Sequence, residues 1–518
     1  MHKKIMLGNE AVARGAYEAG CMVAAGYPGT PSTEILESVA ANYRGIKAQW
    51  SPNEKVALDV VAGASVAGAR AMAAMKHVGL NVAADSLFTL SYTGVNGGMV
   101  IVNADDPGAW SSQNEQDNRH YARAAKLPML DPSSPEEARQ FTSMAFDISE
   151  QFDRPVIVRI TTRVAHSQGA VNLEEPKKAK LKPFERNPKK YVMIPAHARP
   201  RHLFVEEQAK KLKEYSETSG LNRIEWNSRS TGIITNGIAY QYVKEVCPDA
   251  SILKIGMVWP LPDKLICEFC NNVDELYVVE ELDPFIEDYT RALGYKPRGK
   301  EIIPICGELT PEIVDMAINQ KVPGNKIPSY YGKLPGRPPA LCKGCPHGYV
   351  FNVLKKLDLN VNGDIGCYTL AVLPPYSAMH TQTCMGAGIG MHVGFEKARG
   401  EDFIKKTVAV IGDSTFVHSG IAPLIDLVYN KCHGTVIILD NRATAMTGHQ
   451  DHPATGRTLM GEETHELDLE LLAKACGVRR VRKVDPKDVE TFERVVKEEI
   501  EAKEPSVIIS LRKCILKR

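Results

Sequence analysis

Two apolar runs in the C-terminal third of the chain each end in a polar residue that suits a divalent cation. The run 408–411 leads to Asp413, and the run 436–439 leads to Asn441, 28 positions after Asp413. A helix-like stretch, 420–430, lies between them, so the pattern predicts a strand–helix–strand unit. Ligands bind at the carboxyl edge of an open α/β sheet, and we expect both side chains to lie there.

The chemistry predicted for this edge is a diphosphate held through Mg²⁺, which prefers a near-octahedral set of oxygen ligands with few carboxylates. The Asp413 carboxylate, the Asn441 side-chain oxygen and the Ala443 carbonyl would leave positions for two phosphate oxygens and a water. Gly412 is expected to let the backbone turn sharply there. Gly-Asp and Asp-Asn turns are common at strand ends, so the indication comes from the pair at this spacing.

A second group of residues with possible chemistry is a set of cysteines. Cys342 and Cys345 form a C-x-x-C knuckle, which alone is ambiguous among zinc, iron–sulfur, a redox disulfide and chance. Cys367 and Cys514 lie near predicted strand ends, and soft thiolates suit iron. Cys384 competes for the third or fourth place, and buried thiols with at most zinc at the knuckle remain an alternative.

The elements that must position these residues read as strands alternating with helices, which indicates a parallel α/β sheet. In the N-terminal part, 9–20 and 54–75 are helix-like, and 21–26, 99–103 and 155–160 are strand-like. The turn 27–32 follows the first strand, and its Thr30 or Ser32 can cap the next helix. Further strands are predicted at 233–235, 252–255, 275–279, 407–411, 435–439 and 506–510. Cys267 and Cys270 fall in an amphipathic helix and are expected to be core thiols.

Composition sets the number of domains and excludes some classes of protein. A chain of 518 residues with 44% hydrophobic residues suggests about three domains. The net charge of +1 gives no global field for nucleic acid or an anionic membrane. We find no signal peptide and no apolar run long enough to span a membrane. Twelve mostly scattered cysteines favour a reducing cytoplasm.

The segment 412–441 is similar to the thiamine-diphosphate signature, Gly-Asp-Gly followed by about two dozen residues and Asn-Asn. Ser414 and Asp440 depart from it, and neither is a predicted metal ligand. The longer runs 412–420 and 439–450, and the N-terminal runs 26–34 and 75–81, resemble the alpha subunits of indolepyruvate:ferredoxin oxidoreductases. The resemblance covers nearly the whole chain.

The resemblance implies an α/β fold with three parallel-sheet domains of the thiamine-diphosphate-binding, transketolase-like type. The expected order is a pyrimidine-binding domain (1–170), a linker (171–225), a transketolase-C-like domain (226–325) and a diphosphate-binding domain (326–518). A second Gly- and Pro-rich linker is predicted at 327–339. The expected cofactor contacts in the last domain are Gly412, Asp413, Ser414, Asn441, Ala443, Thr444 and Met446.

The other half of a thiamine site is a carboxylate that hydrogen-bonds the aminopyrimidine ring and promotes loss of the thiazolium proton. Glu54 is the candidate, because it opens a small-residue helix and matches the family's Asn-Glu-Lys-Val-Ala run; helix capping is the alternative. Thr30 resembles the position that approaches substrate or cofactor. His418 and His77 are weaker candidates for proton transfer or carboxylate binding. Asp105 and Asp106 favour a turn over a second metal site.

The implied activity is oxidative decarboxylation of an aryl (indolepyruvate-like) 2-oxo acid to an acyl-CoA through a thiamine-bound intermediate. The cysteine order in related beta subunits implies that Cys342, Cys345, Cys367 and Cys514 ligate one 4Fe-4S cluster. The expected partners are a smaller second subunit and ferredoxin or another electron carrier, in a dimer of heterodimers. Family alpha subunits usually continue into a ferredoxin-like domain, which this sequence lacks, so electrons are expected to leave through a partner. A non-oxidative thiamine decarboxylase or carboligase and a non-catalytic scaffold remain alternatives.

Overall fold

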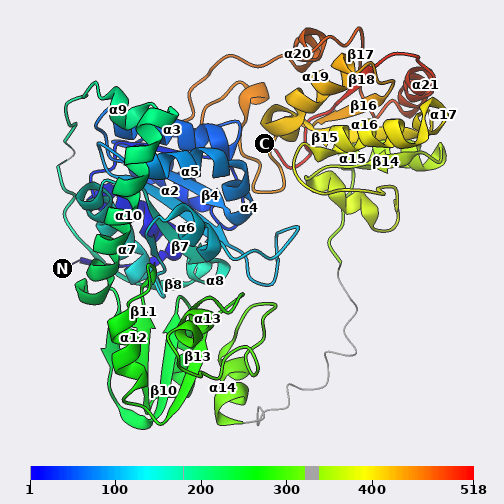
Figure 1. Ribbon diagram of the computed structural model, residues 1–518. Helices are drawn as coiled ribbons and strands as arrows, with labels where there is room; N and C mark the ends of the chain where they lie inside the picture. Colours follow the sequence, from blue (N-terminus) through cyan, green and yellow to red (C-terminus); the bar gives the residue numbers. More distant parts are fainter. Residues whose placement is uncertain (1, 179, 321–337, 518) are drawn as a thin grey trace. The chain divides into compact units, whose positions relative to one another are not determined.

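The computed structural model describes residues 2–178, 180–320 and 338–517, and the chain divides into two compact units, Met1–Gly332 and Lys333–Arg518. Each unit is an α/β structure built on mostly parallel sheets (Figure 1), which confirms the predicted fold class. The first and middle blocks of the sequence belong to one unit. The second predicted linker, 327–339, falls largely outside the described residues.

The main sheet of the first unit has seven strands in the order β12-β6-β7-β5-β4-β2-β3. All neighbours are parallel except β12, which pairs antiparallel with β6. The strands are β2 (Val23–Gly26), β3 (Lys47–Trp50), β4 (Ala71–Lys76), β5 (Met99–Asp105), β6 (Met129–Leu130), β7 (Val156–Thr161) and β12 (Met257–Trp259). The helices are α1 (Gly8–Glu18), α2 (Thr33–Asn42), α3 (Glu54–Val66), α4 (His77–Val82), α5 (Ala84–Thr93), α6 (Arg119–Ala125), α7 (Pro135–Phe152) and α8 (Thr162–His166).

The strand order contains a switch point beside β2, because the chain runs from β2 out to β3 and then returns to β4 on the other side. In open α/β sheets the crevice at such a point, outside the carboxyl ends of the strands, binds ligands. The turn after β2, the start of α3 and the start of α4 all follow strands at this place. The topology therefore directs attention to Thr30, Glu54 and His77.

The predicted helix 54–75 is wrong in its second half. Helix α3 ends at Val66, Gly68 takes a left-handed φ of 97°, and Ala71–Lys76 forms the buried strand β4. Small apolar residues suit a close-packed helix and a central strand equally, so periodicity does not separate them. The glycine at a positive φ is the signal that breaks the segment.

The middle block carries a second, four-stranded sheet in the order β13-β10-β11-β9, in which only β9 is antiparallel to its neighbour. Its elements are β9 (Arg223–Glu225), β10 (Ser228–Asn236), β11 (Ala250–Ile255), β13 (Glu275–Val279), α11 (Ala239–Val246), α12 (Asp263–Cys270), α13 (Phe285–Ala292) and α14 (Pro311–Asn319). One core cluster joins Met75 and Ile101 of the first sheet to Leu253 and Phe285 of this block. Helix α12 has the predicted place, and Cys270 packs into that core.

The segment 171–225, predicted as a linker, is largely structured. Its first residues belong to β8 (Gln168–Leu173), which pairs antiparallel with β1 (His2–Leu7). Helix α9 (Pro188–Tyr191) and the 24-residue helix α10 (Pro195–Thr218) follow. Val205 and Leu212 of α10 are buried, so one narrow apolar side of this charged helix packs on the unit.

The second unit is built on a five-stranded, wholly parallel sheet in the order β14-β15-β16-β18-β17. The strands are β14 (Asn360–Asn362), β15 (Thr407–Gly412), β16 (Thr435–Asp440), β17 (Arg480–Val484) and β18 (Ser506–Leu511). The helices are α15 (Pro346–Lys356), α16 (Ala387–Arg399), α17 (Glu401–Ile404), α18 (Asp413–Thr415), α19 (Ile421–Tyr429), α20 (Leu469–Ala475) and α21 (Val489–Ile500). Short helical turns cover Cys367–Val372, Phe416–Gly420 and Pro453–Thr455.

Both faces of this sheet are covered by helices. Val408 and Val410 of β15 belong to one core with Phe351 and Phe492. Ala409 of the same strand belongs to another core on the opposite face, with residues of α16, α19 and α20. The strands are buried throughout, as expected for a parallel sheet between two helical layers. The carboxyl ends of β15 and β16 are therefore presented at one edge.

Candidate active site

The two strand tips meet in the second unit. β15 and β16 are parallel neighbours, with Gly412 opposite Leu439. Asp413 Oδ2 accepts a hydrogen bond of 2.8 Å from the Arg442 backbone N–H, and Asn441 Oδ1 accepts one of 3.1 Å from the Ala443 N–H. Both side chains are buried. The edge thus gathers a carboxylate and an amide oxygen, the donor types that a magnesium-bound diphosphate requires.

Asp413 lies in a strongly charged setting. His452 Nε2 is 3.1 Å from Asp413 Oδ2, and Ser414 N–H donates to Asp413 Oδ1 over 2.9 Å. Burial alone would raise the pKa of Asp413, but the charge and hydrogen bond of His452 outweigh it and hold the pKa below its usual range. Burial and the neighbouring Asp413 raise the pKa of Asp440 to about 7. A divalent cation bound at Asp413 would favour the charged form of both carboxylates.

Gly412 is needed for a reason other than a sharp turn. Its φ of −76° and ψ of 160° are open to any residue, so the expectation of a special backbone conformation is wrong. A Cβ at Gly412 would lie 2.9 Å from the Tyr368 ring, and the Gly412 N–H donates to the Tyr368 hydroxyl over 2.9 Å. The glycine lets the strand end pack against Tyr368.

The other predicted contacts of the diphosphate divide into two groups. Ser414 and Thr444 lie beside each other, with 2.9 Å between their hydroxyl oxygens, and Ala443 is buried at the strand tip. Met446 is 46% exposed and does not belong to this group; it lines a cavity that is also lined by four cysteines.

Four cysteines line one cavity of about 250 Å³ in the second unit. They are Cys342, Cys345, Cys367 and Cys514. The thiols are near enough that Cys345 and Cys514 raise the pKa of Cys367, after the larger effect of burial, to about 11. A metal that binds thiolates would displace these protons.

Cys384 is exposed and does not line this cavity. The cavity also reaches the diphosphate edge. Asn441 and His347 line it, and the Cys514 N–H donates to the Asn441 carbonyl over 2.9 Å.

His347 and Asp364 are buried polar residues of this unit that sequence reasoning did not single out. Burial lowers the pKa of His347 to about 4 and raises that of Asp364 to about 6. The Asp364 carboxylate accepts from the N–H groups of Gly386 and Gly388 at 2.9 and 3.0 Å, so it caps the start of α16. The signal for His347 was its place directly after the C-x-x-C-Pro run.

His418 lies in the π-helical turn that follows the first strand tip. It is buried, and its Nδ1 is 2.6 Å from the Ser419 hydroxyl. Its charge lowers the pKa of Asp364, against the larger effect of burial. This places His418 near Asp364 in the same unit.

Glu54 lies in the first unit at the switch point of the seven-stranded sheet. It opens α3, whose N-cap is Asn53, and its side chain is buried. A Cβ at Gly79 of α4 would lie 2.6 Å from the Glu54 carboxylate, so Gly79 leaves the space that the carboxylate fills. The capping hydrogen bond is made by Asn53, whose side chain accepts from Val56 N–H over 2.9 Å.

Lys76 is a buried cation beside this carboxylate that sequence reasoning missed. Burial lowers its pKa to about 8, and the charges of Asp106 and Glu54 partly oppose the shift. Its ammonium donates to the Ser111 carbonyl, and its Cβ lies 3.0 Å from the position that a Cβ on Gly29 would take. Lys76 therefore lies close to both the turn after β2 and the Glu54 carboxylate.

Thr30 and Ser32 lie in the turn after β2, which has a cis peptide bond before Pro31. Ser32 is the N-cap residue of α2, but its hydroxyl donates to the Gly29 carbonyl over 2.8 Å rather than capping the helix. Thr30 is partly exposed and lies outside the helix.

His77 and the Asp105–Asp106 pair have structural partners. His77 is fully buried, with Nε2 3.3 Å from the Asn114 carbonyl oxygen, and burial lowers its pKa. Asp105 bonds Arg159 over 2.7 Å, and Asp106 accepts from Ser111 N–H over 2.9 Å. Asp105 is the last residue of β5, and Asp106 leads into the turn at Pro107 and Gly108.

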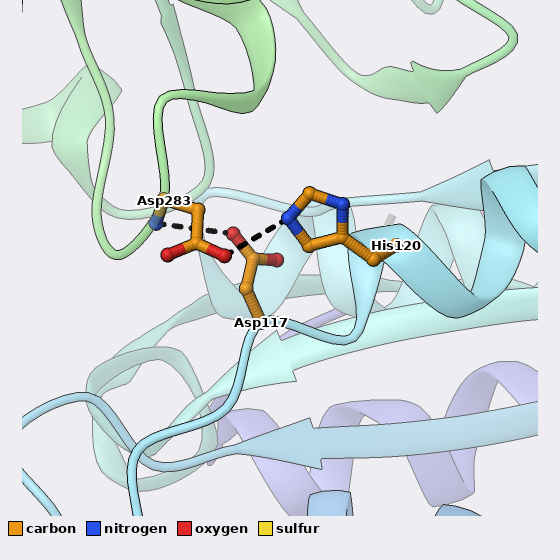
Figure 2. A group of neighbouring side chains, drawn as sticks. All are labelled: Asp117, His120 and Asp283. Atoms are coloured by element: carbon orange, nitrogen blue, oxygen red, sulfur yellow. Dashed lines mark hydrogen bonds and ion pairs between the residues drawn. The ribbon is translucent and has the colours of Figure 1, made fainter.

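Another set of possible metal ligands lies in the first unit at the wall of an open cavity of about 700 Å³. Asp117, His120 and Asp283 bring ligand atoms together (Figure 2). His120 Nε2 is 2.9 Å from Asp283 Oδ2. Asp117 is already paired over 2.5 Å with Arg119, which is fully buried. Because the guanidinium neutralises Asp117, the group is an ion-pair network.

Two known families match the two parts of the chain that hold the predicted cofactor residues. Residues 364–510 match the family described as thiamine pyrophosphate enzyme, C-terminal TPP binding domain. Residues 14–230 match the family described as pyruvate flavodoxin/ferredoxin oxidoreductase, thiamine diP-bdg. The first match contains both strand tips, and the second contains Thr30, Glu54 and Lys76.

Curated relatives resemble the chain over almost its full length. It is 40% identical to indolepyruvate oxidoreductase subunit IorA of Archaeoglobus fulgidus, over 99% of this chain and 87% of that protein. It is 41% identical to the subunit of the same name from Pyrococcus horikoshii, over 100% of this chain and 86% of that protein. The chain belongs to the IorA family. IorA-family membership makes it a subunit of a thiamine-diphosphate-dependent oxidoreductase, as the sequence predicted.

A solved structure supports the fold. The 2-oxoglutarate:ferredoxin oxidoreductase from Magnetococcus marinus, with 2-oxoglutarate, coenzyme A and succinyl-CoA bound, superposes with a TM-score of 0.53 at 19% identity. The superposition covers 61% of this IorA-family chain and 65% of that one. Among the described residues, no helix is long and apolar enough to cross a membrane.

Proposed function

We propose that this chain binds thiamine diphosphate and oxidatively decarboxylates an aryl 2-oxo acid, such as indolepyruvate, to an acyl-CoA. The observation that carries the proposal is the meeting of Asp413 and Asn441 at adjacent strand tips. The names of the relatives support indolepyruvate as the substrate. The bound coenzyme A in the related solved structure supports an acyl-CoA product.

Each predicted cofactor-binding or catalytic residue has a proposed role. Asp413, Asn441 and the Ala443 carbonyl hold Mg²⁺, while Ser414 and Thr444 contact the diphosphate. When bound, thiamine diphosphate supplies a carbanion that adds to the 2-oxo carbon and accepts the electrons of the lost carboxylate. Glu54 holds and moves the proton at the aminopyrimidine ring, in a place from which burial excludes water. Thr30 approaches the substrate, and His418 moves protons beside the diphosphate edge.

The four cysteines provide the route for electrons. Cys342, Cys345, Cys367 and Cys514 line one cavity, and four thiolates around one space suit a 4Fe-4S cluster. A cluster held by these cysteines would supply single-electron transfer to ferredoxin or another carrier. A smaller second subunit completes the enzyme, as a dimer of heterodimers.

The test is anaerobic purification of the chain with its partner subunit, followed by cofactor, iron and sulfide analysis. A panel of aryl, branched and short 2-oxo acids is then assayed with CoA and a viologen acceptor. The proposal expects thiamine diphosphate, about four irons per chain and the highest kcat/KM with aryl 2-oxo acids. An iron-free protein that releases an aldehyde without reducing the viologen would overturn the oxidative reaction.

A further inference from the structure

His347 connects the cysteine knuckle to the proposed cation site. It lies in the first turn of α15, two residues after Cys345. Its ring is buried, and its Nε2 is 3.2 Å from Asn441 Nδ2. The ring also packs edge-on against Tyr368, with 5.8 Å between centroids. The Tyr368 hydroxyl in turn accepts from the Gly412 N–H, so His347 contacts Asn441 directly and the tip of β15 through Tyr368.

The hydrogen bonds of Asn441 determine which way its amide points. An amide nitrogen only donates, so His347 Nε2 is the acceptor. On the other side of the amide, Oδ1 accepts from the Ala443 N–H over 3.1 Å. Rotating the amide by half a turn would place Oδ1 against an acceptor and Nδ2 against a donor, and both hydrogen bonds would be lost. His347 and Ala443 together therefore select one orientation.

This orientation matters because magnesium binds oxygen and not an amide nitrogen. The backbone of Asn441 is held separately, through its carbonyl and the Cys514 N–H at 2.9 Å. The main chain at Asn441 is thus held by the segment that follows β18, while the side chain is oriented by His347 and the Ala443 N–H. If residue 347 offered no acceptor, the Asn441 amide nitrogen would lose this hydrogen bond.

We propose that His347 is a positioning residue that turns the Asn441 amide so that its oxygen faces the cation. The inference rests on the proposed function, because it takes Asn441 as a cation ligand. His347 itself binds neither the cation nor the substrate. Its position after the C-x-x-C knuckle means that the segment that carries Cys342 and Cys345 also sets the geometry of Asn441.

The test measures cation binding rather than turnover. Mn²⁺ replaces Mg²⁺, and its dissociation constant in the presence of thiamine diphosphate is measured by electron paramagnetic resonance. His347→Phe, which keeps a ring but removes the acceptor, is expected to weaken Mn²⁺ binding about tenfold. His347→Gln, whose side-chain oxygen can accept, is expected to stay within about threefold of the wild type. His465→Phe, a matched change at an exposed histidine of the same unit, is expected to have no effect.

A second pair of variants separates positioning from general damage. In Asn441→Asp the side chain has two equivalent oxygens and needs no orientation. Adding His347→Phe to this variant is therefore expected to weaken Mn²⁺ binding by less than about threefold. A tenfold loss in that background too would overturn the inference, as would unchanged binding in His347→Phe alone. If His347→Phe does not fold, His347→Met replaces it. Failure of the wild type to bind thiamine diphosphate with any divalent cation would instead refute the proposed function.

Discussion

Asp413 Oδ2 accepts a hydrogen bond of 2.8 Å from the backbone N–H of Arg442, although the two residues are 29 positions apart. The bond joins the tip of β15 to the residue that follows the tip of β16. It depends on the parallel register of the two strands and on the left-handed φ of 59° at Arg442. The proposed cation site is therefore a property of two strand ends.

Removal of the Asp413 carboxylate is expected to abolish binding of thiamine diphosphate with Mg²⁺. A ligand at 100 times its dissociation constant stabilises the folded protein by about 2.7 kcal/mol, and Asp413→Ala should lose this increment. The measurement is the melting temperature with and without the ligands. Asp402→Ala, at an exposed position of the same unit, serves as the control and should keep the increment. An equal increment in Asp413→Ala would exclude Asp413 as a ligand.

Gly79→Ala is expected to reduce turnover as severely as Glu54→Gln, by at least about 100-fold, while both variants still bind the diphosphate half of the cofactor. The new Cβ would lie 2.6 Å from the Glu54 carboxylate and displace it. The control is Gly63→Ala in α3, where the added Cβ meets open space and helix propensity should improve stability by up to about 1 kcal/mol. Steady-state kinetics and cofactor titration distinguish the effects. Full turnover in Glu54→Gln would remove Glu54 from its proposed role.

Substitution of the cavity cysteines is expected to lower the iron content. Cys345→Ser and Cys367→Ser each remove a proposed ligand, so the anaerobically purified variants should hold well below half of the wild-type iron and sulfide. Cys384→Ser changes an exposed cysteine outside the cavity and should keep the full amount. Iron loss only in Cys384→Ser would show that Cys384 is a ligand and that Cys345 and Cys367 are not.

Glu281 is expected to make the first unit less stable as the pH rises. Burial raises the pKa of Glu281 to about 7, although the Leu309 N–H and the charge of Arg159 oppose the shift. Between its ordinary pKa near 4.5 and about 7, the folded state holds a proton that the unfolded state releases. Stability from this group is therefore complete below pH 4.5 and is lost as the pH rises through 7.

Glu281→Gln keeps a neutral side chain at every pH, and its oxygen can still accept from the Leu309 N–H, 3.1 Å from Oε1 in the wild type. The variant is expected to gain stability over the wild type at pH 8, by about 1 to 3 kcal/mol, and to match it at pH 4.5. Urea unfolding at the two pH values measures the difference. Glu245→Gln, at an exposed position of the same unit, is the control and should differ from the wild type by the same amount at both pH values. A pH-independent difference between Glu281→Gln and the wild type would contradict the shifted pKa.

The residues of the strand-tip edge were predictable because, in a parallel sheet, the residue that follows each strand can be located from the local sequence pattern alone. A buried apolar run followed by Asp413, and a second followed by Asn441, place both residues at one edge whenever the strands are neighbours. Glu54 was found by similarity to a family run, since an acidic residue at a helix start is otherwise an ordinary feature. The structure adds that Asn53 supplies the cap and that Gly79 leaves space for the carboxylate.

The sequence by itself determined the α/β class, the strand ends and the residue types that could bind a cation, because these depend on local periodicity and spacing. Only the tertiary structure decided which distant residues surround them. It showed that Tyr368 packing requires Gly412, that His347 meets Asn441, and that Cys384 stays outside the cysteine cavity. Such contacts join segments far apart in the chain, and side-chain packing between them leaves no periodic trace in the order of the residues.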